Sequence, residues 1–306
     1  MITNKNEFRF TQWFQTSYIN KPMKSISHKQ SVYYSMLIIT ALLWSSGGVL
    51  IKGIAWNPMA IAGTRSFIAG IVIWLALGRP QLTWSIFQIG GAICYSATVI
   101  LYVVANKMTA AANVVLLMYS APIYVIIFGP WFLNEKTSSR DWLIVIVVII
   151  GIIIFFFDNL SSNGLIGNIL AIFSGITFAW MTLFLRRQKR KSPSESVLLG
   201  NFLTAIICLP FLFLEKVPNP KGIILLVVMG VFQLGLSYVL YSRAIQKVRA
   251  IDAVLITSLE PILNPIWVFL IYQEFPEKWA LLGGIIVMTT VLFHAISEIR
   301  FSRGKK

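Results

Sequence analysis

Charged residues are scarce in this sequence. Of its 306 residues, 12% are Asp, Glu, Lys or Arg, whereas 57% are hydrophobic. Soluble globular domains carry about 25% charged residues, so the composition excludes that class. The apolar residues gather in long runs, and we therefore predict an integral membrane protein.

Cysteine and histidine are almost absent. Cys94 and Cys208 lie inside apolar runs and form no CxxC pair, and His28 and His294 supply no HExxH motif. We expect no disulfide framework, no metal site and no cofactor. The sequence also lacks the GxxxxGKS/T motif of a P-loop and the GxSxG motif of a serine hydrolase, so a membrane enzyme is the weakest of the functions considered.

Acidic residues are outnumbered, with 11 Asp and Glu against 26 Lys and Arg. A basic excess is compatible with nucleic-acid binding. In a membrane protein, however, it more often comes from Lys and Arg residues in the cytoplasmic loops. We adopt the second interpretation. The expected surroundings are a lipid bilayer, and no nucleic-acid partner is predicted.

Ten apolar runs have about the length needed to cross a bilayer, which takes roughly 20 helical residues. Their connections are short, so no soluble domain carries separate chemistry. Residues 1–31 and 298–306 form basic tails on either side of them. The predicted spans are 32–51, 58–78, 84–105, 110–132, 141–157, 164–185, 196–214, 222–242, 251–272 and 279–297.

The basic residues predict the orientation of these spans. If the N-terminus is cytoplasmic, the inner loops and tails hold about four times as many Lys and Arg as the outer loops. The outer loops hold only Lys52, Lys107, Lys216, Lys221 and Lys278. We therefore predict a protein of the cytoplasmic membrane with both termini cytoplasmic.

The two halves of the chain resemble each other. Residues 102–136 align over residues 241–275 without a gap, and Tyr, Pro and Glu fall in register, which apolar composition alone does not produce. The matched pairs are Tyr102 with Tyr241, Ala105 with Ala244, Ala111 with Ala250, Val115 with Val254, Leu116 with Leu255, Pro122 with Pro261, Ile123 with Ile262, Ile127 with Ile266 and Glu135 with Glu274.

A duplicated half with five spans must enter the membrane upside down relative to the first. Inverted repeats of this kind place a site between the halves, and rocking of one half against the other exposes it to each side in turn. The predicted fold is an all-α integral membrane protein. Its ten transmembrane helices form two inverted five-helix repeats, residues 32–157 and 164–297, around a central cavity.

Glu260 is the strongest candidate for a functional residue. It lies near the middle of the ninth run, directly before Pro261 and one turn before Pro265. A carboxylate inside a bilayer costs about 2.5–3.5 kcal/mol and marks a functional site by default. It is a candidate for binding a substrate amine or carrying a coupling proton, and the alternative is a carboxyl bonded to a backbone group that the proline frees.

Arg65 lies inside the second run. It is a candidate for holding a substrate carboxylate or for pairing with Glu260 as a gate, and the alternative is an arginine that locks helices together. Other inward-facing candidates for substrate binding or coupling are aromatic or polar residues inside the runs. They are Trp44, Ser45, Tyr95, Tyr102, Tyr119, Trp180, Gln233, Tyr238, Ser258 and Asn264. As a set they favour a cavity with aromatic walls and neutral polar groups.

Several motifs resemble one known family. LWSSGG with Lys52 in the first run, GTRSF around Arg65, and LEPIL followed by YQE resemble the EamA family of the drug/metabolite transporter superfamily. The resemblance covers residues 32–297 and implies a ten-helix basket that moves amino acids, related metabolites or drugs, often outward. Ser45 departs from the family, whose members commonly carry Gly there. The matching positions are Trp44, Arg65, Pro122, Glu135, Glu260, Pro261 and Glu274, of which Pro122, Pro261, Glu135 and Glu274 are expected to act as helix breaks or gates.

The expected function is secondary transport by alternating access. We expect export of a small metabolite such as an amino acid or a drug-like compound, and protons as a candidate coupling ion. The alternative within transport is uptake or exchange of a nucleotide-like or sulfonium metabolite.

Overall fold

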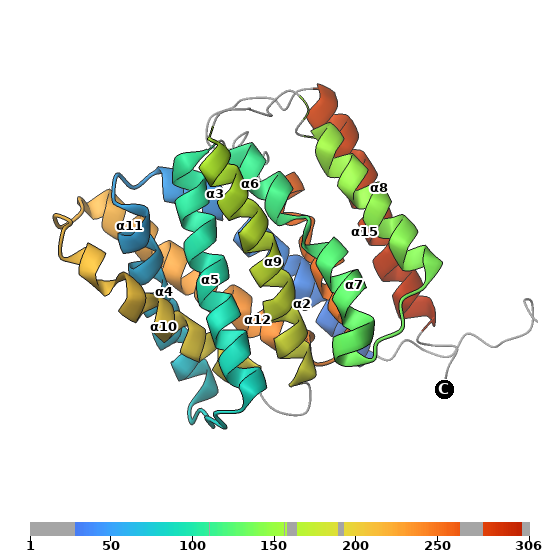
Figure 1. Ribbon diagram of the computed structural model, residues 1–306, viewed down its shortest axis with the longest axis horizontal. Helices are drawn as coiled ribbons and strands as arrows, with labels where there is room; N and C mark the ends of the chain where they lie inside the picture. The colour runs from blue at the N-terminus through green and yellow to red at the C-terminus, as the bar shows by residue number, and fades with distance from the viewer. Residues whose placement is uncertain are drawn as a thin grey trace, which may run out of the picture.

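The computed structural model describes residues 28–109, 111–155, 157, 164–188, 193–263 and 278–301. Within these ranges all the named secondary-structure elements are helices (Figure 1). They are α2 (His28–Trp44), α3 (Gly47–Lys52), α4 (Pro58–Leu77), α5 (Ile86–Met108), α6 (Ala111–Met118), α7 (Ala121–Leu133), α8 (Ser139–Phe155), α9 (Leu165–Arg187), α10 (Ser194–Leu212), α11 (Pro220–Val228), the π-helix η2 (Met229–Leu236), α12 (Ser237–Ala244), α13 (Ala250–Thr257) and α15 (Lys278–Phe301).

Seven described helical stretches are long and apolar enough to cross a membrane, and each overlaps one of the predicted runs. They are Ser31–Ile51, Pro58–Leu77, Ile86–Met108, Leu165–Arg187, Ser194–Leu212, Pro220–Ala244 and Leu281–Glu298. The shorter helices α6, α7, α8 and α13 lie in the three remaining runs. The described part of the chain is therefore all-helical, and the protein is a membrane protein, as its composition predicts.

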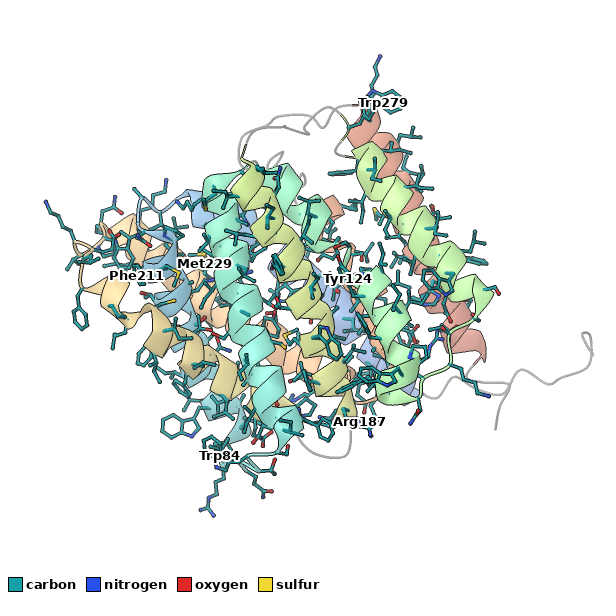
Figure 2. The ribbon with its side chains drawn as sticks, in the orientation of Figure 1. Trp84, Tyr124, Arg187, Phe211, Met229 and Trp279 are labelled. Carbon is teal, nitrogen blue, oxygen red and sulfur yellow. The ribbon has the colours of Figure 1, made fainter. Side chains whose placement is uncertain are left out.

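Large apolar side chains project outward along the helices (Figure 2). Leu75, Ile86 and Phe213 are each more than 70% exposed, which suits contact with lipid and not with water. Trp84 and Arg187 lie at one end of the molecule and Trp279 at the opposite end (Figure 2). Tryptophan at both ends of a helical bundle is typical of the two membrane interfaces.

Local sequence determines where several helices begin. The side chain of Asn57 accepts a hydrogen bond from the Met59 amide at the start of α4, and Pro58 occupies the first turn. Ser85 caps α5 through the Gln88 amide, and Asn219 caps α11 through the Gly222 amide. These caps satisfy backbone donors that the first turn leaves open, and the three helices begin within two residues of the predicted starts of their runs.

The helices pack in pairs from the two halves of the chain. α4 packs against α10, and α8 packs against α15 at one flank of the bundle (Figure 1). α5 lies along α9, while α12 lies along α2. The packed interior between these pairs contains the aromatic residues Trp44, Tyr95, Tyr119, Phe178 and Tyr241, all buried.

Three helical stretches are interrupted inside the bundle. α2 ends at Trp44 and α3 begins at Gly47, α6 ends at Met118 and α7 begins at Ala121, and α13 ends at Thr257 before helical structure resumes at Glu260. The second and third breaks immediately precede Pro122 and Pro261, which cannot donate the next helical hydrogen bond. These breaks bring non-helical backbone to the middle of the protein.

A π-helix interrupts the stretch from α11 to α12. It spans Met229–Leu236, and two of its glycines allow it to approach α4 closely. A Cβ at Gly230 would lie 2.5 Å from Ile68 Cβ, and one at Gly235 would lie 2.9 Å from Val72 Cβ. The wider turn aims Gln233 into the interior, and π-helical turns often occur at functional sites.

Candidate functional site: a buried pocket between the two halves

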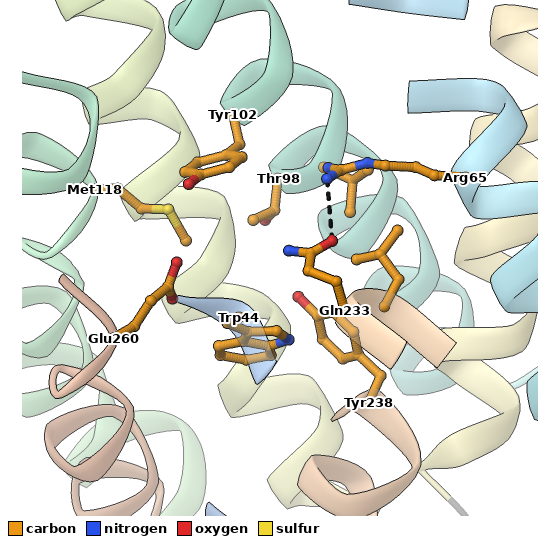
Figure 3. Close-up of a pocket in the computed structure, with 10 residues that line it drawn as sticks. Trp44, Arg65, Thr98, Tyr102, Met118, Gln233, Tyr238 and Glu260 are labelled. Carbon is orange, nitrogen blue, oxygen red and sulfur yellow. Dashed lines mark hydrogen bonds between the residues drawn. The ribbon is translucent and has the colours of Figure 1, made fainter. Parts of the chain in front are cut away.

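One pocket lies at the centre of the bundle, where the three breaks and the π-helix meet (Figure 3). Its volume is about 30 Å³. A cavity needs about 10–15 Å³ of such volume to hold one water molecule, so the pocket has room for only a few water molecules. The residues that line it are Trp44, Arg65, Thr98, Val99, Tyr102, Met118, Gln233, Leu234, Tyr238 and Glu260.

Arg65 supplies the positive charge of the pocket from α4. It is 1% exposed, and its Nη1 donates a hydrogen bond to Gln233 Oε1 at 3.2 Å. Its Nε has no hydrogen-bond partner in the structure. A buried donor without a partner costs about 1–3 kcal/mol, so this guanidinium has unused capacity to donate hydrogen bonds.

Trp44 forms an aromatic wall of the pocket at the end of α2. Its indole Nε1 donates to Ser237 Oγ at 2.9 Å, which ties the first helix break to the junction of η2 and α12. Its ring packs against Tyr238 at a centroid distance of 4.9 Å and against Tyr241 at 5.3 Å. The hydrogen bond and the ring contacts fix the indole plane beside the pocket.

Glu260 supplies the negative or neutral carboxyl from the opposite side of the pocket to Arg65 (Figure 3). It is 6% exposed, and its Oε2 makes a short hydrogen bond with the Tyr119 hydroxyl. The same hydroxyl oxygen lies 2.9 Å from the carbonyl oxygen of Thr257. Arg65 and Glu260 form no ion pair with each other in the structure, so they are available separately to a ligand between them.

Several predicted site residues pack behind the pocket. The Tyr95 hydroxyl donates to Asn201 at 3.0 Å, and its ring supports Tyr238 at a centroid distance of 4.7 Å. The hydroxyl groups of Ser45 and Ser258 donate to backbone carbonyls of their own helices, at Leu42 and Val254. All three residues are buried but none lines the pocket.

Trp180 lies in a different aromatic cluster, which also contains Phe128, Trp131, Phe132 and Phe184. The structure therefore does not bring it to the pocket. Asn264 and Glu274 lie outside the described residues.

The predicted helix-break and gate residues lie in two different places. Pro122 is the second residue of α7, and Pro261 is the second helical residue after the break that follows α13, so both prolines lie at interruptions near the pocket. Glu135 lies at an end of the molecule. Its Oε1 forms an ion pair with Arg186 Nε at 2.6 Å, and its Oε2 accepts a hydrogen bond from the Ala250 backbone amide at 3.0 Å. Glu135 therefore connects the region after α7 to α9 and to the start of α13.

The sequence analysis missed pocket residues that lie on the same helical face as predicted ones. Thr98 and Val99 follow Tyr95 by three and four residues and precede Tyr102, so all four lie on one face of α5. Met118 immediately precedes Tyr119 at the end of α6. Helical spacing from the predicted tyrosines was the signal that could have identified Thr98 and Val99.

It also missed a buried polar cluster around Arg249. Arg249 Nη2 lies 3.0 Å from Asp141 Oδ1 and 2.8 Å from Asp252 Oδ1, and it reaches Glu298 at 3.5 Å. Asp252 also bonds His294 Nε2 at 2.9 Å and the Tyr34 hydroxyl at 3.4 Å. We call these six residues the Arg249 cluster. It joins the start of α13 to α2, α8 and α15 at the end of the molecule where Arg186 binds Glu135.

The charge of Arg249 is firmly held. Burial lowers its pKa, but the neighbouring carboxylates of Asp252, Asp141 and Glu298 favour the charged form more strongly, so the pKa is raised above its ordinary value. The cluster therefore keeps a permanent cation between carboxylates of three helices.

A helical membrane protein with a buried, charge-bearing pocket at interrupted helices has the organisation of a solute carrier. The EamA-like transporter family model matches residues 31–157 and again residues 165–296. The chain belongs to this family.

Relatives and a solved structure agree with this assignment. The uncharacterized transporter YwfM of Bacillus subtilis is 24% identical over 282 residues, which cover 86% of this chain and 94% of that protein. An uncharacterized transporter of Archaeoglobus fulgidus is 22% identical over 84% of this chain and 93% of that protein. The S-adenosylmethionine uptake transporter of Rickettsia felis is 26% identical over 59% of this chain and 61% of that protein. One crystal structure aligns with a TM-score of 0.75 over 90% of this chain and 99% of that chain, at 16% identity, which shows the fold alone.

Proposed function

We propose that this protein is a secondary transporter of small metabolites that carry both an amino group and a carboxylate, such as amino acids. The observation that carries the proposal is the guanidinium of Arg65 and the carboxyl group of Glu260 at opposite sides of one buried pocket (Figure 3). Arg65 has an unpartnered Nε for a carboxylate, and Glu260 offers a carboxyl for an amine. Trp44, Tyr102 and Tyr238 provide aromatic surface for the rest of the substrate.

The proposed architecture is ten transmembrane helices in two inverted repeats, residues 32–157 and 164–297. The helix breaks support it: with residues 102–136 placed over 241–275, Ala111 and Ala250 coincide as helix starts. In the same alignment the break at Tyr119 and Ser120 falls on the break at Ser258 and Leu259. The pairing of α4 with α10 and of α8 with α15 is consistent with a twofold axis between such repeats.

Transport in this proposal proceeds by alternating access. A pocket of about 30 Å³ is too small for an amino acid, so in this proposal substrate binding requires the helices around it to move apart. The interrupted helices at the pocket are suitable hinges because their backbone already lacks some helical hydrogen bonds. In the proposed coupling, Glu260 also carries a proton.

The proposed location is the cytoplasmic membrane, with both termini cytoplasmic. The end that bears Arg187 in Figure 2 would face the cytoplasm, because Arg79, Arg140, Arg186 and Arg249 also lie in the loops and helix ends predicted there. The opposite end, with Trp279, would face outward. The helices between them are those long and apolar enough to span the bilayer.

The direction proposed is export, on the resemblance of the motifs to outward carriers. The second candidate is uptake of a sulfonium metabolite, which the Rickettsia relatives favour by their names. S-adenosylmethionine also carries an amino group and a carboxylate, so both candidates use Arg65 in the same way. They differ in the cation and the purine ring that the pocket must accept.

Ligand-dependent stability of the purified protein tests the proposal. A ligand at 100 times its Kd stabilises the folded form by about 2.7 kcal/mol. We expect an amino acid to raise the melting temperature, while its decarboxylated amine and its deaminated acid do not. Stabilisation by S-adenosylmethionine alone would favour the second candidate, and stabilisation only by uncharged compounds or free nucleotides would overturn both.

Transport in proteoliposomes then decides the direction. The protein is inserted into vesicles in one orientation, and the stabilising compound is placed either inside or outside them. Flux across the membrane is then measured in each direction under a pH gradient. Net movement from the Arg187 end to the Trp279 end corresponds to export. Exclusive movement in the opposite direction would contradict the proposed export.

A further inference from the structure

The Tyr119 hydroxyl lies at hydrogen-bond distance from two oxygen atoms but has only one proton to donate. Its oxygen bonds both Glu260 Oε2 and the carbonyl oxygen of Thr257. The Tyr119 and Thr257 oxygens are 2.9 Å apart, which leaves no room for a water molecule between them, so the proton of this contact must come from the Tyr119 hydroxyl. A phenol has one proton and a backbone carbonyl has none.

The proton count therefore depends on Glu260. If the carboxyl is ionised, the Tyr119 proton satisfies one of the two contacts and two oxygen atoms face each other without a hydrogen between them. If the carboxyl is protonated, it donates to the Tyr119 oxygen, and Tyr119 donates to Thr257. The described arrangement is fully satisfied only with the acid form of Glu260.

Pro261 explains why the Thr257 carbonyl needs this partner. In an uninterrupted helix the carbonyl of residue 257 accepts from the amide of residue 261, but Pro261 has no N–H. Thr257 is also the last residue of α13. Inside a membrane such a carbonyl must be satisfied by another group, and here that group is the hydroxyl of Tyr119 from the other half of the chain.

We propose that Tyr119 is a positioning residue that couples protonation of Glu260 to the helix break after Thr257. With Glu260 protonated, the hydrogen bonds from Glu260 to Tyr119 and from Tyr119 to Thr257 hold the backbone at the helix break in its described conformation. When Glu260 releases its proton to water admitted to the pocket, Tyr119 turns its own proton to the carboxylate. The Thr257 carbonyl then loses its donor, and the break loosens. This inference rests on the proton-coupled part of the proposed function.

Three other titratable groups face Glu260 from the surrounding helices. Arg65 lies on α4, Tyr102 on α5 and Tyr238 on α12. None of them hydrogen-bonds Glu260 in the structure, whereas Tyr119 does. Arg65 attracts the ionised form at a distance, so it favours proton release without taking part in the Tyr119 chain.

Amide hydrogen exchange across 258–263, corrected for the intrinsic effect of pH, tests this coupling without any substrate. In the wild-type protein we expect protection of this segment at low pH and its loss as pH rises through the titration of Glu260. Glu260→Gln keeps a neutral donor to Tyr119, so protection should persist across the range. Tyr119→Phe removes both bonds, so protection should be low at every pH.

Tyr241→Phe is the matched control. Tyr241 is a buried tyrosine, and among the described residues its hydroxyl bonds only the Thr182 hydroxyl, at 2.7 Å, and no carboxyl group. This variant should keep the wild-type pH dependence. If Tyr119→Phe also keeps it, or if Glu260→Gln loses protection with rising pH as the wild type does, the proposed coupling is wrong.

Infrared spectroscopy of the folded wild-type protein keeps the test valid if Tyr119→Phe does not fold. A hydrogen-bonded carboxylic-acid carbonyl band should be present at neutral pH and absent in Glu260→Gln. A band that is absent from the wild type at neutral pH and low pH alike would overturn the proposal. These readouts use no ligand, so a failed amino-acid screen and a failed coupling test are distinguishable.

Discussion

The side-chain amide of Gln233 occupies the space where any residue other than glycine at position 47 would carry its Cβ. A Cβ built on Gly47 would lie 2.8 Å from Gln233 Nε2. Gly47 begins α3 directly after the first helix break, and Gln233 comes from the π-helix of the other half. The glycine therefore admits the side chain that holds Arg65 in place.

We predict that Gly47→Ala weakens ligand binding while the protein stays folded. The added methyl displaces the Gln233 amide, so Gln233 no longer accepts from Arg65 at its present position. The apparent affinity for an amino acid should fall about tenfold, which corresponds to about 1.4 kcal/mol. Thermal-shift titration measures it. Gly129→Ala is the control, because no atom of the described residues lies within 4 Å of a Cβ at Gly129, and an equal loss in both variants would exclude this explanation.

Arg65→Lys should impair recognition of the substrate carboxylate. A lysine keeps the positive charge but loses the planar fork that binds a carboxylate through two parallel hydrogen bonds. We expect the KM for an amino acid to rise at least about tenfold, with a smaller change in the maximal rate. Arg243→Lys makes the same exchange at an exposed residue and should behave as the wild type. An unchanged KM in Arg65→Lys would remove Arg65 from substrate binding.

Glu260→Gln should separate exchange from proton-driven accumulation. The glutamine cannot release a proton, so an imposed pH gradient should no longer concentrate substrate in proteoliposomes. Exchange of labelled for unlabelled substrate needs no net proton movement and should persist. Glu195→Gln is the control, because Glu195 is a buried carboxyl group outside the pocket. It accepts a hydrogen bond from the backbone amide of Gln81. A Glu260→Gln protein that still concentrates substrate would show that another group couples transport to protons.

The sequence predicts the parts of this fold that depend on local chemistry. Apolar runs predict where helices begin and end, and Pro122 and Pro261 predict where two of them break. Ionisable residues inside apolar runs must face protein, and on that physical ground Arg65 and Glu260 were expected in a central pocket. The structure brings both of them there.

Features that depend on helix rotation and long-range packing could not be predicted in the same way. A single aromatic residue does not reveal which way its helix faces, and Trp180 was expected in the pocket but packs with Phe128 and Phe132. The π-helix packs closely against α4 at Gly230 and Gly235, and this contact joins segments that are far apart in the sequence. Asp252 lies inside an apolar run and could have been found, but its partners Arg249 and His294 come together only in the folded chain.

The Arg249 cluster is expected to hold one end of the molecule closed. Arg249 bonds Asp141 on α8 and Asp252 on α13, whose side chains are only 3% and 2% exposed. Removing Arg249 leaves the buried carboxylates of Asp141 and Asp252 without their positively charged partner. Breaking a buried ion pair in this way lowers the free energy of unfolding by about 3–5 kcal/mol. We predict that Arg249→Ala lowers the apparent melting temperature by at least about 5 °C and opens this end.

Cysteine labelling measures the opening. Ala253 is fully buried one turn into α13, so Ala253→Cys in a protein with Cys94→Ser and Cys208→Ser should react slowly with a water-soluble maleimide. Adding Arg249→Ala should increase that rate several-fold, because water reaches the start of α13 once the ion pairs are lost. Arg243→Ala removes the same charge from an exposed position nearby and should leave the rate unchanged. If labelling of the folded Arg249→Ala protein stays slow, the cluster stabilises the fold without closing the entrance.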